Sequence, residues 1–236
     1  MILNSRNRPH LLSNFLESVV ATTDNIDEIE IIIGLDNDDP TLSDSLAVVG
    51  RYPSATPVVG GRPSNLIHAL NALACRSVGS YLFILNDDVI LRTQGWDTLA
   101  YLTLSAHVYR HPSGVVYGRT HDLSIDKDKD GKYAAFPIIS KKACEILGFC
   151  MPNEFCGLGG DVATYRIYDA VDRVADLEIT LDHVLHRTVE QVVNPDKTAY
   201  EMRQLTYQNR MDWKDYDIST YVEKLQNYIQ NYVDNF

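Results

Sequence analysis

Apolar and polar positions alternate between strand-like and helix-like patterns over the first 90 residues. Apolar runs predict strands at residues 2–3, 28–36, 56–62 and 81–86. Residues 11–20 have the spacing of an amphipathic helix, and a second helix has an apolar face from Leu66 to Ala74, with Ser64 as its expected N-cap. This alternation predicts an α/β domain with a mostly parallel, Rossmann-like central sheet flanked by helices.

The second half of the chain has a more mixed pattern. Strands are predicted at 113–120 and 134–140, joined by a hairpin tip at 125–133, and a late strand at 178–188. A short helix follows Ser140, and a glycine-rich loop at 155–161 leads into a helix over 162–171.

A C-terminal amphipathic helix is predicted over residues 216–236. Ile218, Tyr221, Leu225 and Ile229 belong to its apolar stripe. Such a stripe most often packs on the parent domain, and a homodimer contact is the alternative. We therefore expect one domain over residues 1–205 and a helical extension over 206–236 that packs on it.

The composition is that of an ordinary globular protein, with 236 residues of which 45% are hydrophobic and 22% charged. No apolar stretch is long enough to cross a bilayer and no targeting segment is visible, so we expect a cytoplasmic protein. Cys75, Cys144, Cys150 and Cys156 form no C-x-x-C pair, and buried free thiols are the expected state.

The net charge narrows the range of partners. The chain has 21 basic and 32 acidic residues, a formal charge of −11. This charge opposes binding to a polyphosphate backbone, so nucleic acid is a disfavoured partner. An anionic ligand would need a compensating positive charge, which a metal ion held by carboxylates would supply.

Polar clusters follow three of the predicted strands, at residues 5–8, 36–39 and 86–88. Ligands of α/β sheets bind at the carboxyl ends of the strands, so these clusters are expected to meet at one edge. Asp87 and Asp88 are adjacent carboxylates, and their simplest role is to cap a turn. Side by side they repel unless a cation or hydrogen-bond donors compensate them, which suits Mg²⁺ or Mn²⁺ with a nucleotide diphosphate.

The order of these segments resembles a known enzyme family. SRNRPHLLSNFLESV after the first strand, IIIGLDNDDP, NLIHALNALA, and YLFILNDDV followed by GWD are similar to the inverting family 2-type glycosyltransferases of the GT-A fold. The resemblance covers roughly residues 1–200. LNDDV lies where that family has its DxD signature, with Asn86 in place of the first Asp found in many members.

The resemblance implies roles for individual residues at the donor site. Asp36 would contact the base or ribose of a nucleotide sugar, with Ser5, Arg6, Arg8 and Arg62 also near the nucleotide. Asp87 would lie by the ribose and the metal, and Asp88 would bind the divalent ion that bridges the diphosphate.

FCGLGGDVATYR resembles the acceptor loop of these enzymes, which makes Asp161 the candidate general base. Inversion needs a carboxylate that takes the proton of the attacking acceptor hydroxyl. Gly159 and Gly160 would let the backbone and acceptor approach closely. The alternative is that Asp161 only caps the helix that begins at Val162.

ITLDHVLHRT resembles the segment in which a histidine closes over the metal of the diphosphate. His183 is the better match and His186 the reserve, while a structural histidine is the alternative for both. Trp96 could stack on a sugar at the acceptor side, or belong to the core. DKDKDG (126–131) starts like an EF-hand loop but has Pro137 where a glutamate is required, so a solvated hairpin tip is expected.

The sequence as a whole predicts a hexosyl-type glycosyltransferase. It would move a sugar from a nucleotide diphosphate sugar, expected to be a UDP-sugar, to an acceptor hydroxyl with inversion and with Mn²⁺ or Mg²⁺. Lipid, glycan, protein and a modified base are all open as acceptors. A nucleotidyltransferase is one alternative, although SRNRP lacks the glycine-rich loop of that class. A noncatalytic nucleotide-sugar-binding module is the other, suggested by Asn86.

Overall fold

The computed structural model describes residues 1–124, 133–156, 159–184 and 216–234. Three parallel strands form the N-terminal sheet, in the order β1 (Ile2–Ser5), β2 (Ile31–Asp36) and β3 (Ala55–Gly60). Ile2 pairs with Ile32, and Ile31 pairs with Ala55. The carboxyl ends of all three strands therefore lie at the same edge, as the alternating pattern predicted.

Five further strands continue this layer in the order β4 (Tyr81–Phe83), β7 (Ile138–Ser140), β6 (Tyr117–Asp122), β8 (Val174–His183) and β5 (Val89–Leu91). A parallel bridge between Ile2 and Ile84 connects the two sheets, and the N–H of Leu85 donates to the carbonyl of Ile2 at 3.0 Å. The β6–β8 pair is parallel, whereas β4–β7, β6–β7 and β5–β8 are antiparallel. The parallel arrangement thus holds for the N-terminal half, and the rest of the layer is mixed.

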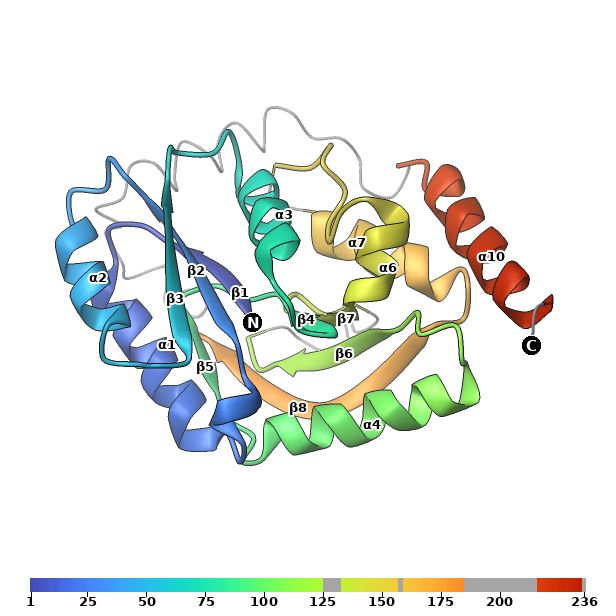
Figure 1. Ribbon diagram of the computed structural model, residues 1–236, viewed down its shortest axis with the longest axis horizontal. Coiled ribbons are helices and arrows are strands. Elements are labelled where there is room, and N and C mark those ends of the chain that lie inside the picture. The colour runs from blue at the N-terminus through green and yellow to red at the C-terminus, as the bar shows by residue number, and fades with distance from the viewer. Residues whose placement is uncertain (125–132, 157–158, 185–215, 235–236) are drawn as a thin grey trace.

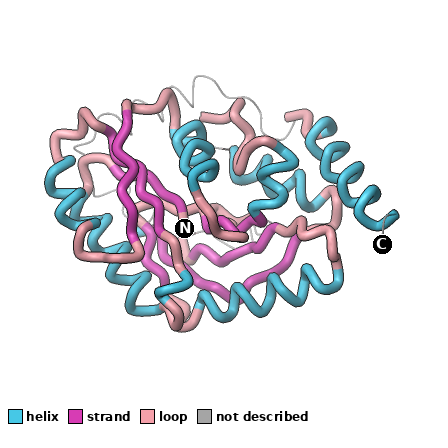
Figure 2. Tube along the Cα trace, viewed as in Figure 1, coloured by secondary structure: helices cyan, strands magenta, loops and turns pink. Residues whose placement is uncertain are grey.

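Helices cover both faces of this layer (Figures 1 and 2). The first core cluster lies under α1 (Pro9–Thr22), α2 (Leu42–Val49) and α4 (Trp96–Arg110). The second lies under α3 (Leu66–Arg76), α6 (Lys141–Leu147), α7 (Gly160–Asp169) and α10 (Ser219–Asp234). A short 3₁₀ helix at Ile26–Glu28 precedes β2.

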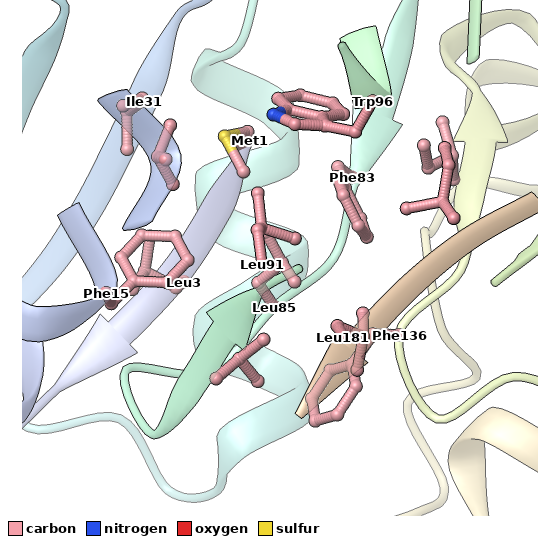
Figure 3. Close-up of a cluster of buried hydrophobic side chains, with 14 of the residues drawn as sticks. Met1, Leu3, Phe15, Ile31, Phe83, Leu85, Leu91, Trp96, Phe136 and Leu181 are labelled. Carbon is pink, nitrogen blue, oxygen red and sulfur yellow. The ribbon is translucent and has the colours of Figure 1, made fainter. Parts of the chain in front are cut away.

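Consecutive strand residues supply opposite clusters because side chains alternate across a strand. Leu3, Phe83 and Leu85 belong to the first cluster, part of which Figure 3 shows, whereas Ile2, Leu82 and Ile84 belong to the second. Both sets are buried. The unbroken apolarity of residues 81–85 is therefore explained by a strand with a core on each side.

The C-terminal helix packs against the second core cluster. Leu225 is fully buried, and Tyr221, Tyr228 and Ile229 pack around it on α6 and α7. Tyr221 also donates to Glu154 Oε1 at 2.7 Å. The expected boundary between residues 205 and 206 lies outside the described residues. Among the described residues, no helix has the length and apolarity that spanning a bilayer demands.

Two predictions need correction, one about the N-cap of α3 and one about the burial of the cysteines. Ser64 is not the N-cap of α3: Asn65 holds that position, and its Oδ1 accepts the N–H of His68 at 2.8 Å. Ser64 Oγ instead lies 2.6 Å from His68 Nδ1. The expectation of buried thiols holds for Cys144 and Cys150, but Cys75 is exposed on α3.

The N-cap gives a prediction for stability. Asn65→Ala leaves the N–H of His68 without its side-chain acceptor and is expected to lower the free energy of unfolding by about 1 kcal/mol. Ser64→Ala, one residue earlier, is the matched control and is expected to change it by less than about 0.5 kcal/mol. Urea unfolding followed by circular dichroism measures both. Equal losses in the two variants would contradict the assignment of the cap.

Candidate functional site

The loops after β1 and β4 meet in a buried polar cluster. Ser5 Oγ donates to Asp87 Oδ2 at 2.7 Å, and Arg8 Nη2 lies 2.7 Å from Asp87 Oδ1. Arg8 Nη1 is also 3.7 Å from Asp88 Oδ2. The structure thus brings together two of the clusters that the sequence placed at this edge. Arg8, assigned to the nucleotide, is a direct partner of the carboxylate pair.

The loop after β2 joins the same edge. Arg6 Nη1 donates to Asp36 Oδ2 at 3.0 Å and to Asp38 Oδ1 at 2.5 Å. The N–H of Asn7 donates to Asp39 Oδ2 at 2.9 Å, and Asn7 has a left-handed backbone with φ of 56°. Asparagine tolerates this conformation better than most residues. All three predicted clusters therefore converge.

Arg62 lies at the outer limit of this edge. Its side chain is exposed just after β3, where it follows Gly60 and Gly61. Hydrogen bonding by Arg6 is the main reason that the pKa of Asp38 is lowered, and the charge of Arg62 contributes to the same effect. The charge of Arg62 therefore acts on Asp38, the carboxylate that Arg6 also binds.

Asp88 connects the edge to the late strand β8. Its Oδ2 is 3.3 Å from His183 Nε2, and His183 Nδ1 is 3.7 Å from Asp122 Oδ2 at the end of β6. The His183 ring meets Phe136 edge-on, with ring centres 5.0 Å apart. Because Val89 pairs with His183 across β5 and β8, the histidine is held beside the carboxylates by the sheet itself.

The electrostatics of this group follow from its burial. Asp87 is fully buried and Asp88 is 6% exposed. Burial raises the pKa of Asp87 against the opposing charge of Arg8. Burial also acts on Asp88, but His183 and Arg8 hold the pKa of Asp88 below its usual value. Burial would lower the pKa of His183, yet hydrogen bonds and charges from Asp122 and Asp88 raise it to about 9.

The Asp88–His183 pair has the chemistry of a divalent metal site. Asp88 Oδ1 is buried and has no hydrogen-bond partner among the described residues. The 3.3 Å between Asp88 Oδ2 and His183 Nε2 suits neighbouring ligands of one ion, since ligands about 2.1 Å from an ion and at right angles lie about 3.0 Å apart. Without metal, the imidazolium supplies the positive charge between the carboxylates, and metal binding would displace its proton.

Asp88 and His183 do not form a complete metal cage. In the described ranges, no group of three or more His, Cys, Asp or Glu side chains is arranged to hold a metal ion. An ion at Asp88 would therefore keep positions for water or for diphosphate oxygens, which is how Mg²⁺ and Mn²⁺ sites that serve nucleotides are built. His186, the reserve ligand, lies outside the described residues.

A pocket of about 260 Å³ opens beside the carboxylate pair. Asp87 and Asp88 line it together with Leu11 and Asn14 of α1, Ile90 of β5, and the residues just after β5 and β8, which are Arg92 and Val184. Arg92 Nη2 donates to Asp182 Oδ2 at 2.9 Å, so it brings a paired guanidinium to the rim. The pocket gives the buried carboxylates a route to solvent.

Asp161 lies in the first turn of α7, after Gly159, which is left-handed with φ of 86°. Its Oδ1 accepts the N–H of Val162 at 2.9 Å. Burial raises the pKa of Asp161 to about 6, although backbone hydrogen bonds lower it. A Cβ at Gly160 would come within 2.5 Å of Ile67 Cδ1, so the end of the Ile67 side chain would have to shift to admit a larger residue there.

Asp161 is not among the residues that line the pocket at Asp87 and Asp88, nor is Asp36. The charge of Asp161 acts instead on Tyr117, at the start of β6. The alternative that Asp161 is the N-cap needs correction, because α7 begins at Gly160 and Gly159 is its N-cap. The role of Asp161 as a base stays a prediction.

Trp96 belongs to the core and not to an acceptor surface. It is 4% exposed, its ring lies 5.4 Å from that of Phe83, and its Nε1 donates to Thr23 Oγ1 at 2.9 Å (Figure 3). Of the two alternatives given for Trp96, the structure therefore shows the core and not a sugar contact at the acceptor side. Its indole N–H is satisfied inside the protein.

Asp122 was missed by the sequence analysis, although it contacts His183. A signal was available, because Asp122 lies just past the predicted strand 113–120 and ends β6, as Asp36 ends β2. β6 and β8 are parallel, so their carboxyl ends meet, and the pair Asp122 and His183 could have been predicted once that pairing was known.

Comparison with known proteins finds solved structures of similar fold but no similar sequence. No protein-family model and no curated protein sequence matches the chain. The fold is similar to S. aureus TarS 1–349 in complex with UDP-GlcNAc, with a TM-score of 0.58 at 12% identity over 97% of this chain and 70% of that chain. It spans 42% of the longer TarS structure.

The mannosyltransferase PcManGT from Pyrobaculum calidifontis, solved with GDP-Man and Mn²⁺, has a TM-score of 0.63 at 12% identity over 99% of this chain and 74% of that chain. At such identity the likeness concerns architecture. The parallel sheet with its flanking helices agrees with the sequence prediction, and so do these solved structures. The chain has the α/β fold of GT-A glycosyltransferases.

Proposed function

We propose that this protein is a glycosyltransferase that uses a nucleotide diphosphate sugar and a divalent metal ion. The observation that carries the proposal is the convergence of three loops on one edge of the sheet, where Asp87 and Asp88 are buried beside a pocket. Enzymes of this fold bind nucleotide sugars, as the TarS and PcManGT complexes illustrate. Ligands of open α/β sheets bind at this edge.

The donor would lie across the loops after β1 and β2. Asp36 is the proposed contact to the base or ribose, and Arg6 holds its carboxylate in place. Ser5 and Arg8 fix Asp87, so the acidic edge is rigid before the donor arrives. We infer a UDP-sugar as donor from the resemblance of the sequence, and GDP-sugars are the alternative that the PcManGT complex raises.

Asp88 and His183 would hold the metal ion, Mn²⁺ or Mg²⁺. The ion would neutralise charge on the leaving diphosphate. Asp122 contributes through His183, because its carboxylate faces the second ring nitrogen and orients the imidazole.

Asp161 would act as the general base of an inverting displacement. It takes the proton from the acceptor hydroxyl while the bond to the diphosphate breaks and the new glycosidic bond forms. A pKa of about 6 suits this task, because the carboxylate is ionised at neutral pH and still a stronger base than an exposed aspartate. Gly159, which is left-handed, is the N-cap of α7, so Asp161 lies at the second position of the helix.

Donor binding gives a prediction for Asp36. Asp36→Ala is expected to raise the KM for the donor by roughly 10- to 100-fold with little change in kcat, because it removes a hydrogen bond made equally in ground and transition states. Asp27→Ala, an exposed aspartate on the 3₁₀ helix, is the control and is expected to behave as wild type. Initial rates over a range of donor concentrations measure both. A fall in kcat with unchanged KM would place Asp36 elsewhere in the mechanism.

The proposal is tested by a screen of nucleotide sugars. We expect one UDP- or GDP-sugar to raise the melting temperature with Mn²⁺ present and less without it, since a ligand of the folded state stabilises it. That donor should then release free nucleoside diphosphate in the presence of an acceptor or, slowly, of water. Binding without release would indicate a noncatalytic module, and release of pyrophosphate from a nucleoside triphosphate would indicate a nucleotidyltransferase.

A further inference from the structure

The outward face of α4 is an apolar stripe formed by Leu99, Leu102, Ala106 and Tyr109. Leu99 is 37%, Leu102 59% and Tyr109 88% exposed, while Leu104 on the opposite face is buried against the sheet. The helix runs along the outside of β8 (Figure 1). The intervals of three, four and three residues between stripe positions are those of the seam between two paired helices.

The stripe is free of charge on a strongly acidic molecule. No Asp, Glu, Lys or Arg occurs from Thr98 to Tyr109, whereas the chain has a formal charge of −11. His107 is buried, and burial lowers its pKa to about 4, so it is neutral near pH 7. Two copies of an acidic chain repel each other least where they meet through an uncharged face.

The ends of the stripe have opposite charges. Asp24 lies at the N-terminal end, where its Oδ2 accepts the hydroxyl of Thr98 at 2.9 Å. Arg110 is exposed at the C-terminal end of the same helix. Two such helices in antiparallel orientation bring each acidic end beside a basic end, and they also set their helix dipoles in opposition.

We propose that two copies of this chain associate through their α4 stripes, with the two helices antiparallel. The two-fold axis would cross the stripe at the level of residue 104, midway between Leu102 and Ala106. In this register Leu99 faces the partner's Tyr109, and Leu102 faces the partner's Ala106. The same register places Arg110 opposite the partner's Thr98, to which Asp24 is hydrogen-bonded. Apolar side chains thus meet apolar ones at both levels, and the charged ends match, as a self-complementary interface requires.

Sedimentation velocity of the full chain over about 1 to 100 µM tests the proposal. Wild type is expected to form a dimer of the 26.6 kDa chain. Leu102→Lys adds a charge to the centre of the stripe and is expected to raise the dimer dissociation constant at least about 100-fold. Val78→Lys, at an 86% exposed valine outside α4, is the matched control and is expected to leave it unchanged.

A charge swap tests the antiparallel register. Arg110→Glu is expected to weaken the dimer about tenfold, and adding Asp24→Lys to the same chain is expected to restore it, since the pairs then match with reversed sign. A chain that stays monomeric over the whole range contradicts the proposal. A dimer that Leu102→Lys leaves intact also contradicts it.

Discussion

Asp88→Asn is expected to lower the transferase rate by at least about 1,000-fold. The change keeps the shape of the side chain but removes the charge that faces the metal position, and metal-assisted stabilisation of a leaving group is worth several kcal/mol. Because Asp88 is also the partner of His183 and Arg8, the variant alters both contacts. Rates measured with saturating donor and Mn²⁺ give the effect.

The control for this variant is Asp176→Asn. Asp176 lies on the same strand β8 as His183, with an exposed side chain that pairs with Arg119. The same chemical change there is expected to leave the rate within about twofold of wild type. Circular dichroism and the melting temperature show whether Asp88→Asn is folded. A folded variant that keeps most of its activity would remove Asp88 from the mechanism.

Asp161→Asn is expected to lower kcat by about 100- to 10,000-fold, the range that a positioned general base contributes. Donor affinity should change little, because Asp161 is proposed to act on the acceptor. In wild type, kcat/KM should fall about tenfold per pH unit below pH 6, since the base must be ionised and its pKa is about 6. The variant should lack this acidic limb. An unchanged limb would assign it to another group.

The same variant should be more stable than wild type at neutral pH. Burial raises the pKa of Asp161 above its unfolded value of 3.8, so ionisation destabilises the folded state progressively from about pH 4 and fully above pH 6. Asparagine removes that penalty and is expected to add about 1 to 3 kcal/mol at pH 7 and nothing at pH 3. Denaturant unfolding at the two pH values measures the difference. A variant that is no more stable than wild type at pH 7 would contradict the raised pKa of the buried carboxyl.

The convergence at the sheet edge could be predicted from sequence because it depends only on topology. Parallel strands end at the same edge, so Ser5, Asp36 and Asp87 had to be near one another once the strand-helix alternation was recognised. The individual partners could not be predicted. Arg8 reaches Asp87 because α1 starts at Pro9 and turns the guanidinium inward, which depends on the local backbone.

Two elements of the structure have no readable signal in the sequence, for different physical reasons. α4 was not predicted because it is apolar on its outward face as well as its buried face, so no helical periodicity stands out. The role of Trp96 was left open as a consequence, because the orientation of α4 sets the direction of its side chain. β5 is only three residues long and follows directly on Asp88, too short for any pattern.

The contact between Asp88 and His183 depends on the most distant pairing in the site. β8 joins β5 antiparallel, and this pairing sets Val89 opposite His183 after a separation of more than 90 residues. The resemblance to the glycosyltransferase family implied a role at the metal for both residues. Only the strand pairing explains why they meet.

Crystals soaked with Mn²⁺ and UDP, or GDP if the screen selects it, test the central claim most directly. Anomalous scattering locates Mn²⁺ independently of any model. The account predicts an anomalous peak about 2.2 Å from a carboxylate oxygen of Asp88, with diphosphate oxygens beside it and the base over the loop that carries Asp36. A nucleotide bound elsewhere, or a peak remote from Asp88, would contradict it.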